Sequence, residues 1–230
     1  MSQFLQEGFL SKLQYLESLG AINFFKNLLP DLNLQQITIL CDISDGMHAM
    51  FDTLKYSVSC IAWLSLRSQI SVKVIPFNDN PQLNVPVFST QSDYRRLVYF
   101  LESLKLQSSS NINKVLAESK PNNNNITILV SGLLNSNTPF FEWLYDTPTQ
   151  IMILHLFEPS LFVTSNCQFI TNKGNIYRNE DTYINIVKFL QEIDTICEKL
   201  HIPIVRMAQK DGWLHLAYYL FNYLEYCNDN

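Results

Sequence analysis

Five apolar runs recur along the chain, and the intervals between them leave room for helices. The runs are rich in Val, Ile and Leu and span residues 37–42, 70–77, 126–130, 151–157 and 202–207. Strands of this kind are typical of a parallel sheet that helices cover on both faces. The pattern therefore predicts an α/β fold with a doubly wound, mostly parallel sheet flanked by helices.

The segments between and after these runs are predicted to be helices, and the one that starts at Met47 is expected to be long and buried. Helices are predicted over 47–68, 92–106, 111–118, 138–145, 180–200 and 213–226, and a hairpin over 167–178. Ser92 is expected to cap the helix that it begins, with Asp93 in the first turn. Two further helices, over 4–19 and 22–29, precede the first strand. We therefore expect a helical extension over 1–35 and an α/β domain over 36–230.

Composition and charge exclude several classes of partner and location. The net charge is −5 and no Lys/Arg run is present, whereas a nucleic-acid binder needs basic side chains for phosphates. No apolar stretch reaches the ~20 residues of a membrane span, and the N-terminus lacks a signal-peptide pattern. The five cysteines are far apart, which favours reduced cysteines in the core. We therefore expect a cytoplasmic protein that binds no nucleic acid and has no membrane span.

The residues that follow the first strand are the first candidates for a site, because ligands bind at the carboxyl ends of strands in open α/β sheets. They read Asp42-Ile-Ser-Asp-Gly-Met47 and contain no dinucleotide, P-loop or G-x-S-x-G motif. Cys41 with His48, or Asp42 with Asp45, is a poor catalytic pair because no third group is placed to assist it. The sequence therefore assigns no catalytic residue. An Asp followed two residues later by a hydroxyl does offer oxygen ligands to a hard cation.

Asp42 and Ser44 resemble the start of the D-x-S-x-S-M signature, which opens the metal-ion-dependent adhesion site of von Willebrand factor A domains. Further short motifs follow in the family's order: Lys55, Ser108–Leu116, Ile126–Gly132, His155–Pro159, Thr171–Gly174, Ile202–Arg206 and Leu216–Leu220. Together they resemble the bacterial von Willebrand factor A-like family that accompanies MoxR-type AAA+ ATPases. The resemblance covers roughly residues 37 to 225. It implies a three-layer fold and a role in assembling or maturing another protein complex.

The sequence departs from the family's metal site at three positions. Gly46 replaces the second hydroxyl, Ser110 is the best match for a Thr, and Gly132 stands where an Asp is expected. Asp42, Ser44 and Ser110 remain as candidate metal ligands, which is fewer than the about six oxygens that hard cations take. We therefore expect a degenerate site with no cofactor, or with Mg²⁺ bound weakly at most. The favoured alternative is that Asp42 and Ser44 cap the next helix and satisfy backbone amides.

The function predicted from these features is a non-catalytic protein-interaction module, with a MoxR-type AAA+ ATPase as the partner that the resemblance implies. The alternative is an α/β enzyme, a hydrolase or nucleotide-sugar binder, with a pocket near Asp42. The candidate partner-binding face gathers residues from two strand ends and one helix start: Asp42, Ser44, Asp45, Gly46, Met47, Ser110, Asn111, Ser131 and Gly132.

Overall fold

The computed structural model describes residues 14, 35–107, 109–119, 125–133, 151–157, 169–170, 176–177 and 180–208 of the chain. Of the helix predicted over 4–19, only Gln14 falls within these residues, and it is helical. The helices predicted over 22–29, 138–145 and 213–226 lie outside the described residues. The proposed division of the chain after residue 35 stays a prediction.

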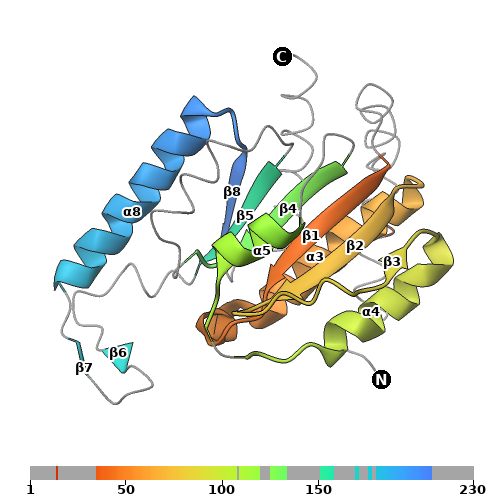
Figure 1. The fold of residues 1–230 in the computed structure, drawn as a ribbon, viewed down its shortest axis with the longest axis horizontal. Coiled ribbons are helices and arrows are strands. Elements are labelled where there is room, and N and C mark those ends of the chain that lie inside the picture. Colours follow the sequence, from red (N-terminus) through yellow and green to blue (C-terminus); the bar gives the residue numbers. More distant parts are fainter. Residues whose placement is uncertain are drawn as a thin grey trace.

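Six strands form one sheet in the order β3-β2-β1-β4-β5-β8 (Figure 1). Five of them are the predicted strands: β1 (Gln36–Asp42), β2 (Ser71–Phe77), β4 (Asn125–Ser131), β5 (Ile151–Phe157) and β8 (Ile204–Ala208). Each pairs with its neighbour in parallel, which confirms the predicted doubly wound, mostly parallel sheet. The chain passes from β1 to β2 on one side, and β4 lies on the other side of β1. The switch point, where such sheets bind ligands, is therefore the gap between the carboxyl ends of β1 and β4.

The sixth strand, β3 (Val87–Phe88), was not predicted. It is two residues long and pairs antiparallel with β2, through Val72 with Phe88 and Lys73 with Val87. Phe88 is buried in the core, whereas Val87 is 45% exposed. A strand this short at the edge of a sheet leaves few unpaired backbone groups open to other chains.

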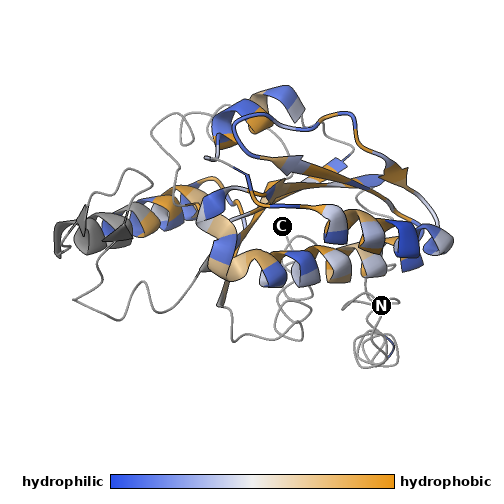
Figure 2. Cartoon of the chain, turned by 90° about the horizontal axis from the view of Figure 1, so that it is seen from below, coloured by the Kyte–Doolittle hydropathy of each residue, from blue (hydrophilic) through white to orange (hydrophobic). Residues whose placement is uncertain are grey.

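Helices cover both faces of the sheet (Figure 2). One core cluster joins Ile37, Ile39 and Cys41 of β1 to α3 (Phe51–Arg67) and α4 (Tyr94–Ser103). The other joins Leu40 of β1 to α5 (Ile112–Ser119) and α8 (Glu180–Lys199). Successive residues of β1 thus enter opposite clusters, as the two-residue period of a strand requires. This double burial explains why β1 is apolar at nearly every position.

The predicted hairpin is confirmed, and three predicted boundaries move. β6 (Phe169–Ile170) and β7 (Ile176–Tyr177) pair antiparallel. The helix expected from Met47 begins instead as a 3-10 turn, η3 (Asp45–Met50), which leads into α3. The predicted cap at Ser92 is wrong: Thr90 and Asp93 form the capping box, and the 3-10 turn η4 (Gln91–Asp93) precedes α4. β8 starts two residues later than expected, at Ile204.

Candidate functional site

Asp42 is the last residue of β1, and its carboxylate lies at the switch point with only 3% of the residue exposed. One carboxylate oxygen, Oδ1, accepts the backbone N–H of Ser44 at 3.0 Å. The other, Oδ2, accepts the hydroxyl of Ser131 at 2.6 Å and that of Ser110 at 3.3 Å. A buried carboxylate is costly unless hydrogen bonds compensate for its lost hydration. Here three donors, from three separate segments, do so.

Ser131 ends β4, the strand beside β1, and it is fully buried. Its hydroxyl donates to Asp42 and also accepts the backbone N–H of Leu133 at 3.0 Å. Leu133 has a φ of 56°, a left-handed conformation that is uncommon for a leucine. A Ser side chain that binds the backbone two residues on stabilises such a turn. Ser131 therefore fixes both the carboxylate and the turn that follows β4.

Met47 and His155 make a second set of contacts with the turn that follows β4, both of them to Gly132. The Gly132 N–H lies 3.0 Å from the sulfur of Met47, and the Gly132 carbonyl is 3.2 Å from Nε2 of His155. His155 is paired in register with Ser131 and is 1% exposed. Burial, together with the positive charge of Arg206, lowers the pKa of His155 to about 4, although its contact with the Gly132 carbonyl opposes this shift. His155 is therefore neutral at pH 7.

A network of polar side chains joins the loop after β2 to the segment before α5. The Asn78 side chain donates to Gln107 at 3.1 Å, and the Asn78 carbonyl accepts the Asn111 N–H at 3.1 Å. Ser109 donates to Asp79 at 2.7 Å, while the Asn111 side chain caps α5 by accepting the Lys114 N–H at 3.0 Å. These bonds fix the segment that carries Ser110 next to Asp42.

The nine residues of the predicted face are brought together, but to different depths. Five of them are buried and face the protein interior, namely Asp42, Ser44, Met47, Ser131 and Gly132. Asp45, Gly46 and Asn111 are exposed, and Ser110 is partly exposed. In this conformation only the second group can touch a partner directly, and the first group supports it.

The alternative role given to Asp42 and Ser44 is half right. Asp42 does satisfy a backbone amide, that of Ser44. Ser44 is the residue before η3, but its side chain makes no capping hydrogen bond.

The Cys41 thiol, considered as a nucleophile, is fully buried, and burial next to Asp42 raises its pKa. That thiol stays protonated, while His48 is exposed.

Sequence reasoning missed His155 as a part of the site, and it did not predict the left-handed conformation of Leu133. His155 had a usable signal, because it is the one strongly polar residue within an apolar strand and lies near that strand's carboxyl end. Leu133 had none, since its sequence does not mark a left-handed turn. Within the described residues, no group of three His, Cys, Asp or Glu side chains is placed to hold a metal ion.

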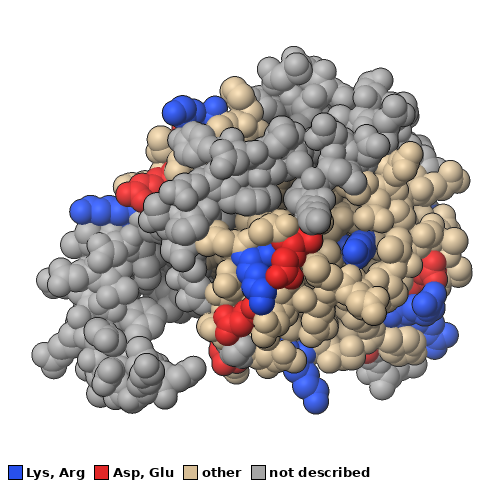
Figure 3. Space-filling view, in the orientation of Figure 1, with Lys and Arg blue, Asp and Glu red and all other residues tan. Residues whose placement is uncertain are grey.

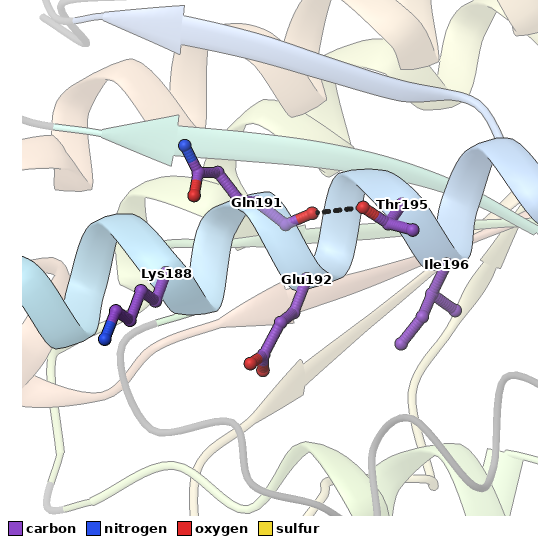
Figure 4. Close-up of a pocket in the computed structure, with 5 residues that line it drawn as sticks. All are labelled: Lys188, Gln191, Glu192, Thr195 and Ile196. Atoms are coloured by element: carbon purple, nitrogen blue, oxygen red, sulfur yellow. Dashed lines mark hydrogen bonds between the residues drawn. The ribbon is translucent and has the colours of Figure 1, made fainter.

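The described surface has two further features, a cavity beside α8 and a face on which charges of both signs are mixed (Figure 3). A cavity of about 450 Å³ borders α8, and its described lining is Lys188, Gln191, Glu192, Thr195 and Ile196 (Figure 4). On the described part of the face in Figure 3, Lys and Arg side chains are interspersed with Asp and Glu. None of the described helices has the length and apolarity of a transmembrane span.

No family model and no curated protein matches the sequence, but solved structures share the fold, and two of them illustrate the likeness. The first is the conserved hypothetical protein BatB from Bacteroides thetaiotaomicron, at 17% identity and a TM-score of 0.57, over 83% of this chain and 99% of that one. The second is an aerotolerance-related membrane protein from Bacteroides fragilis, at 17% identity and a TM-score of 0.56, over 84% and 99%. The predicted α/β fold, a mostly parallel sheet between two layers of helices (Figure 2), is confirmed, and these solved structures share it. At this identity the likeness shows the fold alone.

Proposed function

We propose that this chain is a non-catalytic protein-interaction module of the von Willebrand factor A class, which binds a protein partner at the carboxyl edge of its sheet. The observation that carries the proposal is the hydrogen bonding of Asp42. The two carboxylate oxygens of Asp42 accept hydrogen bonds from Ser44, Ser110 and Ser131. The carboxylate therefore connects the turn after β1, the segment before α5 and the end of β4. An edge fixed in this way presents a defined surface for recognition.

The same contacts argue against the hydrolase alternative. A serine nucleophile must give its proton to a general base and must reach the substrate. Ser131 donates a hydrogen bond to Asp42 and accepts the Leu133 N–H, but it is 0% exposed and therefore does not reach a substrate in this structure. Nothing in the described site favours a nucleotide sugar either, so we propose no second function.

The exposed part of the edge is where we propose that the partner binds. Asp45 and Gly46 project from the first turn after β1, and Asn111 lies at the start of α5. The buried polar contacts beneath these residues hold their backbones in position. Binding between such preformed surfaces loses little conformational entropy.

The identity of the partner is proposed from the sequence resemblance alone. By that resemblance the partner is a MoxR-type AAA+ ATPase, the host is bacterial, and the module works in the cytoplasm on the assembly or maturation of another complex. The aerotolerance role named for the Bacteroides fragilis structure is not part of the proposal, because that likeness supports only the fold.

An affinity capture from the source organism tests both parts of the proposal. The tagged full chain should recover an AAA+ ATPase, and Asp45→Arg should lose it because it reverses a charge on the proposed face. Glu118→Arg is the matched control: it makes the same charge change at an exposed residue near the far end of α5. Equal recovery with both variants would place the partner elsewhere. Turnover of small esters or phosphates by the purified protein, or capture without any AAA+ ATPase, would contradict the proposal.

A further inference from the structure

The metal site that the family resemblance implies can be compared with the donors that this chain supplies. Asp42 gives one negative charge, and Ser44, Ser110 and Ser131 give three hydroxyls. Gly46 and Gly132 provide no side-chain oxygen. Divalent cations are bound tightly where several carboxylates and about six oxygens converge. Among the residues that the structure describes, the side chains at this edge do not fit a tightly bound divalent cation.

The position of the Ser131 hydroxyl gives a physical reason beyond this count. Its oxygen lies 2.6 Å from Oδ2 of Asp42, which is the length of a hydrogen bond from a hydroxyl to a charged carboxylate. Two neighbouring oxygens of an octahedral Mg²⁺ shell lie about 3 Å apart, because each is ~2.1 Å from the ion. Oδ2 already accepts the hydroxyls of Ser131 and Ser110, so a cation at Oδ2 would have to compete with both donors.

We propose that the Ser131 hydroxyl proton takes the place of the divalent cation, so that the carboxyl edge is assembled without a metal. The proton compensates for the buried charge of Asp42, and the Leu133 N–H orients the hydroxyl that supplies it. The same hydroxyl thereby joins β1 to the turn after β4, a link that a cation would otherwise make through shared ligands.

Gly46 is a position at which a metal-binding oxygen can be added to the site. A Cβ added there meets only the Ser44 hydroxyl oxygen, at the ordinary contact distance of 3.7 Å. Gly46→Ser therefore adds an oxygen beside Ser44 without a clash, and Gly46→Ala adds the same Cβ without the oxygen. The two substitutions form a matched pair.

The test is a titration of the purified full chain with Mn²⁺, with free Mn²⁺ followed by electron paramagnetic resonance. The wild-type protein should bind Mn²⁺ no more tightly than about 1 mM, the range of the weakest protein sites. Binding tighter than this, lost in Asp42→Asn, would overturn the proposal. The titration of the wild-type protein needs no variant, and circular dichroism confirms that Asp42→Asn is folded.

A pair of double variants separates the two roles that Ser131 could have. If its proton competes with a cation, Gly46→Ser/Ser131→Ala should bind Mn²⁺ at least about tenfold more tightly than Gly46→Ser. If its oxygen is a metal ligand, the double variant binds equally or less tightly, and the proposal is wrong. Gly46→Ala/Ser131→Ala, which lacks the added oxygen, should not show the gain. Circular dichroism confirms that each variant is folded.

The inference does not rest on the proposed partner. A chain that binds no Mn²⁺ and captures no AAA+ ATPase keeps this inference and loses the proposed function. If the chain binds Mn²⁺ tightly through Asp42 and does capture the ATPase, the proposed function is kept and the metal-free edge is contradicted.

Discussion

Replacing Ser131 by alanine removes one hydroxyl that makes two buried hydrogen bonds. The first is to the Asp42 carboxylate at 2.6 Å, and the second is from the Leu133 N–H at 3.0 Å. A hydrogen bond to a charged group contributes about 1.5–3 kcal/mol, and one from a neutral N–H about 0.5–1.5 kcal/mol. The free energy of unfolding should therefore fall by roughly 2–4 kcal/mol. That is a large share of the ~5–15 kcal/mol that stabilises a typical domain.

Urea unfolding, followed by circular dichroism, measures this change, and Ser65→Ala is its control. Ser65 is also fully buried, but its hydroxyl donates to the Ile61 carbonyl within α3. That carbonyl is in the interior of a helix and keeps its backbone partner, so the control should lose no more than about 1 kcal/mol. If the two variants lose similar amounts, Ser131 has no special place in the site and the reasoning is refuted.

A double-mutant cycle assigns the loss to one pair. Ser131→Ala and Asp42→Asn, measured singly and together, should show a coupling of about 1.5–3 kcal/mol. A coupling near zero would mean that the loss in Ser131→Ala comes from the turn at Leu133 rather than from the carboxylate.

Two further predictions concern protonation and backbone strain. His155 has a lowered pKa of about 4, so the unfolded chain takes up a proton first as the pH falls. The stability that the neutral ring contributes is complete above its unfolded pKa of about 6.5 and is lost between there and about 4. Between about pH 7 and about pH 5, the free energy of unfolding in urea should fall by about 2 kcal/mol more for the wild type than for His155→Gln. If this free energy changes equally with pH in both proteins, the burial argument is contradicted. Gln69, exposed after α3, has a φ of 64°, so Gln69→Gly should gain about 1 kcal/mol and Gln69→Ala about none. Thermal melts check this pair, and an equal gain in both would exclude strain as the cause.

Most of the fold could be predicted because its strands are buried on both faces. β1, β4 and β5 are apolar runs whose ends match the predictions within one residue. β3 could not be predicted, because two residues next to Pro86 carry no periodicity and only pairing with β2 makes them a strand. The cap of α4 was misplaced because Thr90, Ser92 and Asp93 all favour a helix start, and the reciprocal bonding of Thr90 with Asp93 decides between them.

The role of the Ser131 hydroxyl is a property of the site that the sequence does not determine. Asp42 and Ser131 were identified because strand ends meet at one edge of a parallel sheet, and Ser110 was identified from the family resemblance. A hydroxyl, however, is both a donor and an acceptor, so its sequence position does not say whether it gives a proton to a carboxylate or a lone pair to a cation. The 2.6 Å contact between Ser131 and Asp42, with the Leu133 N–H on the same hydroxyl, favours the first role. The two roles predict opposite effects of removing that hydroxyl on cation binding, so the distinction can be measured.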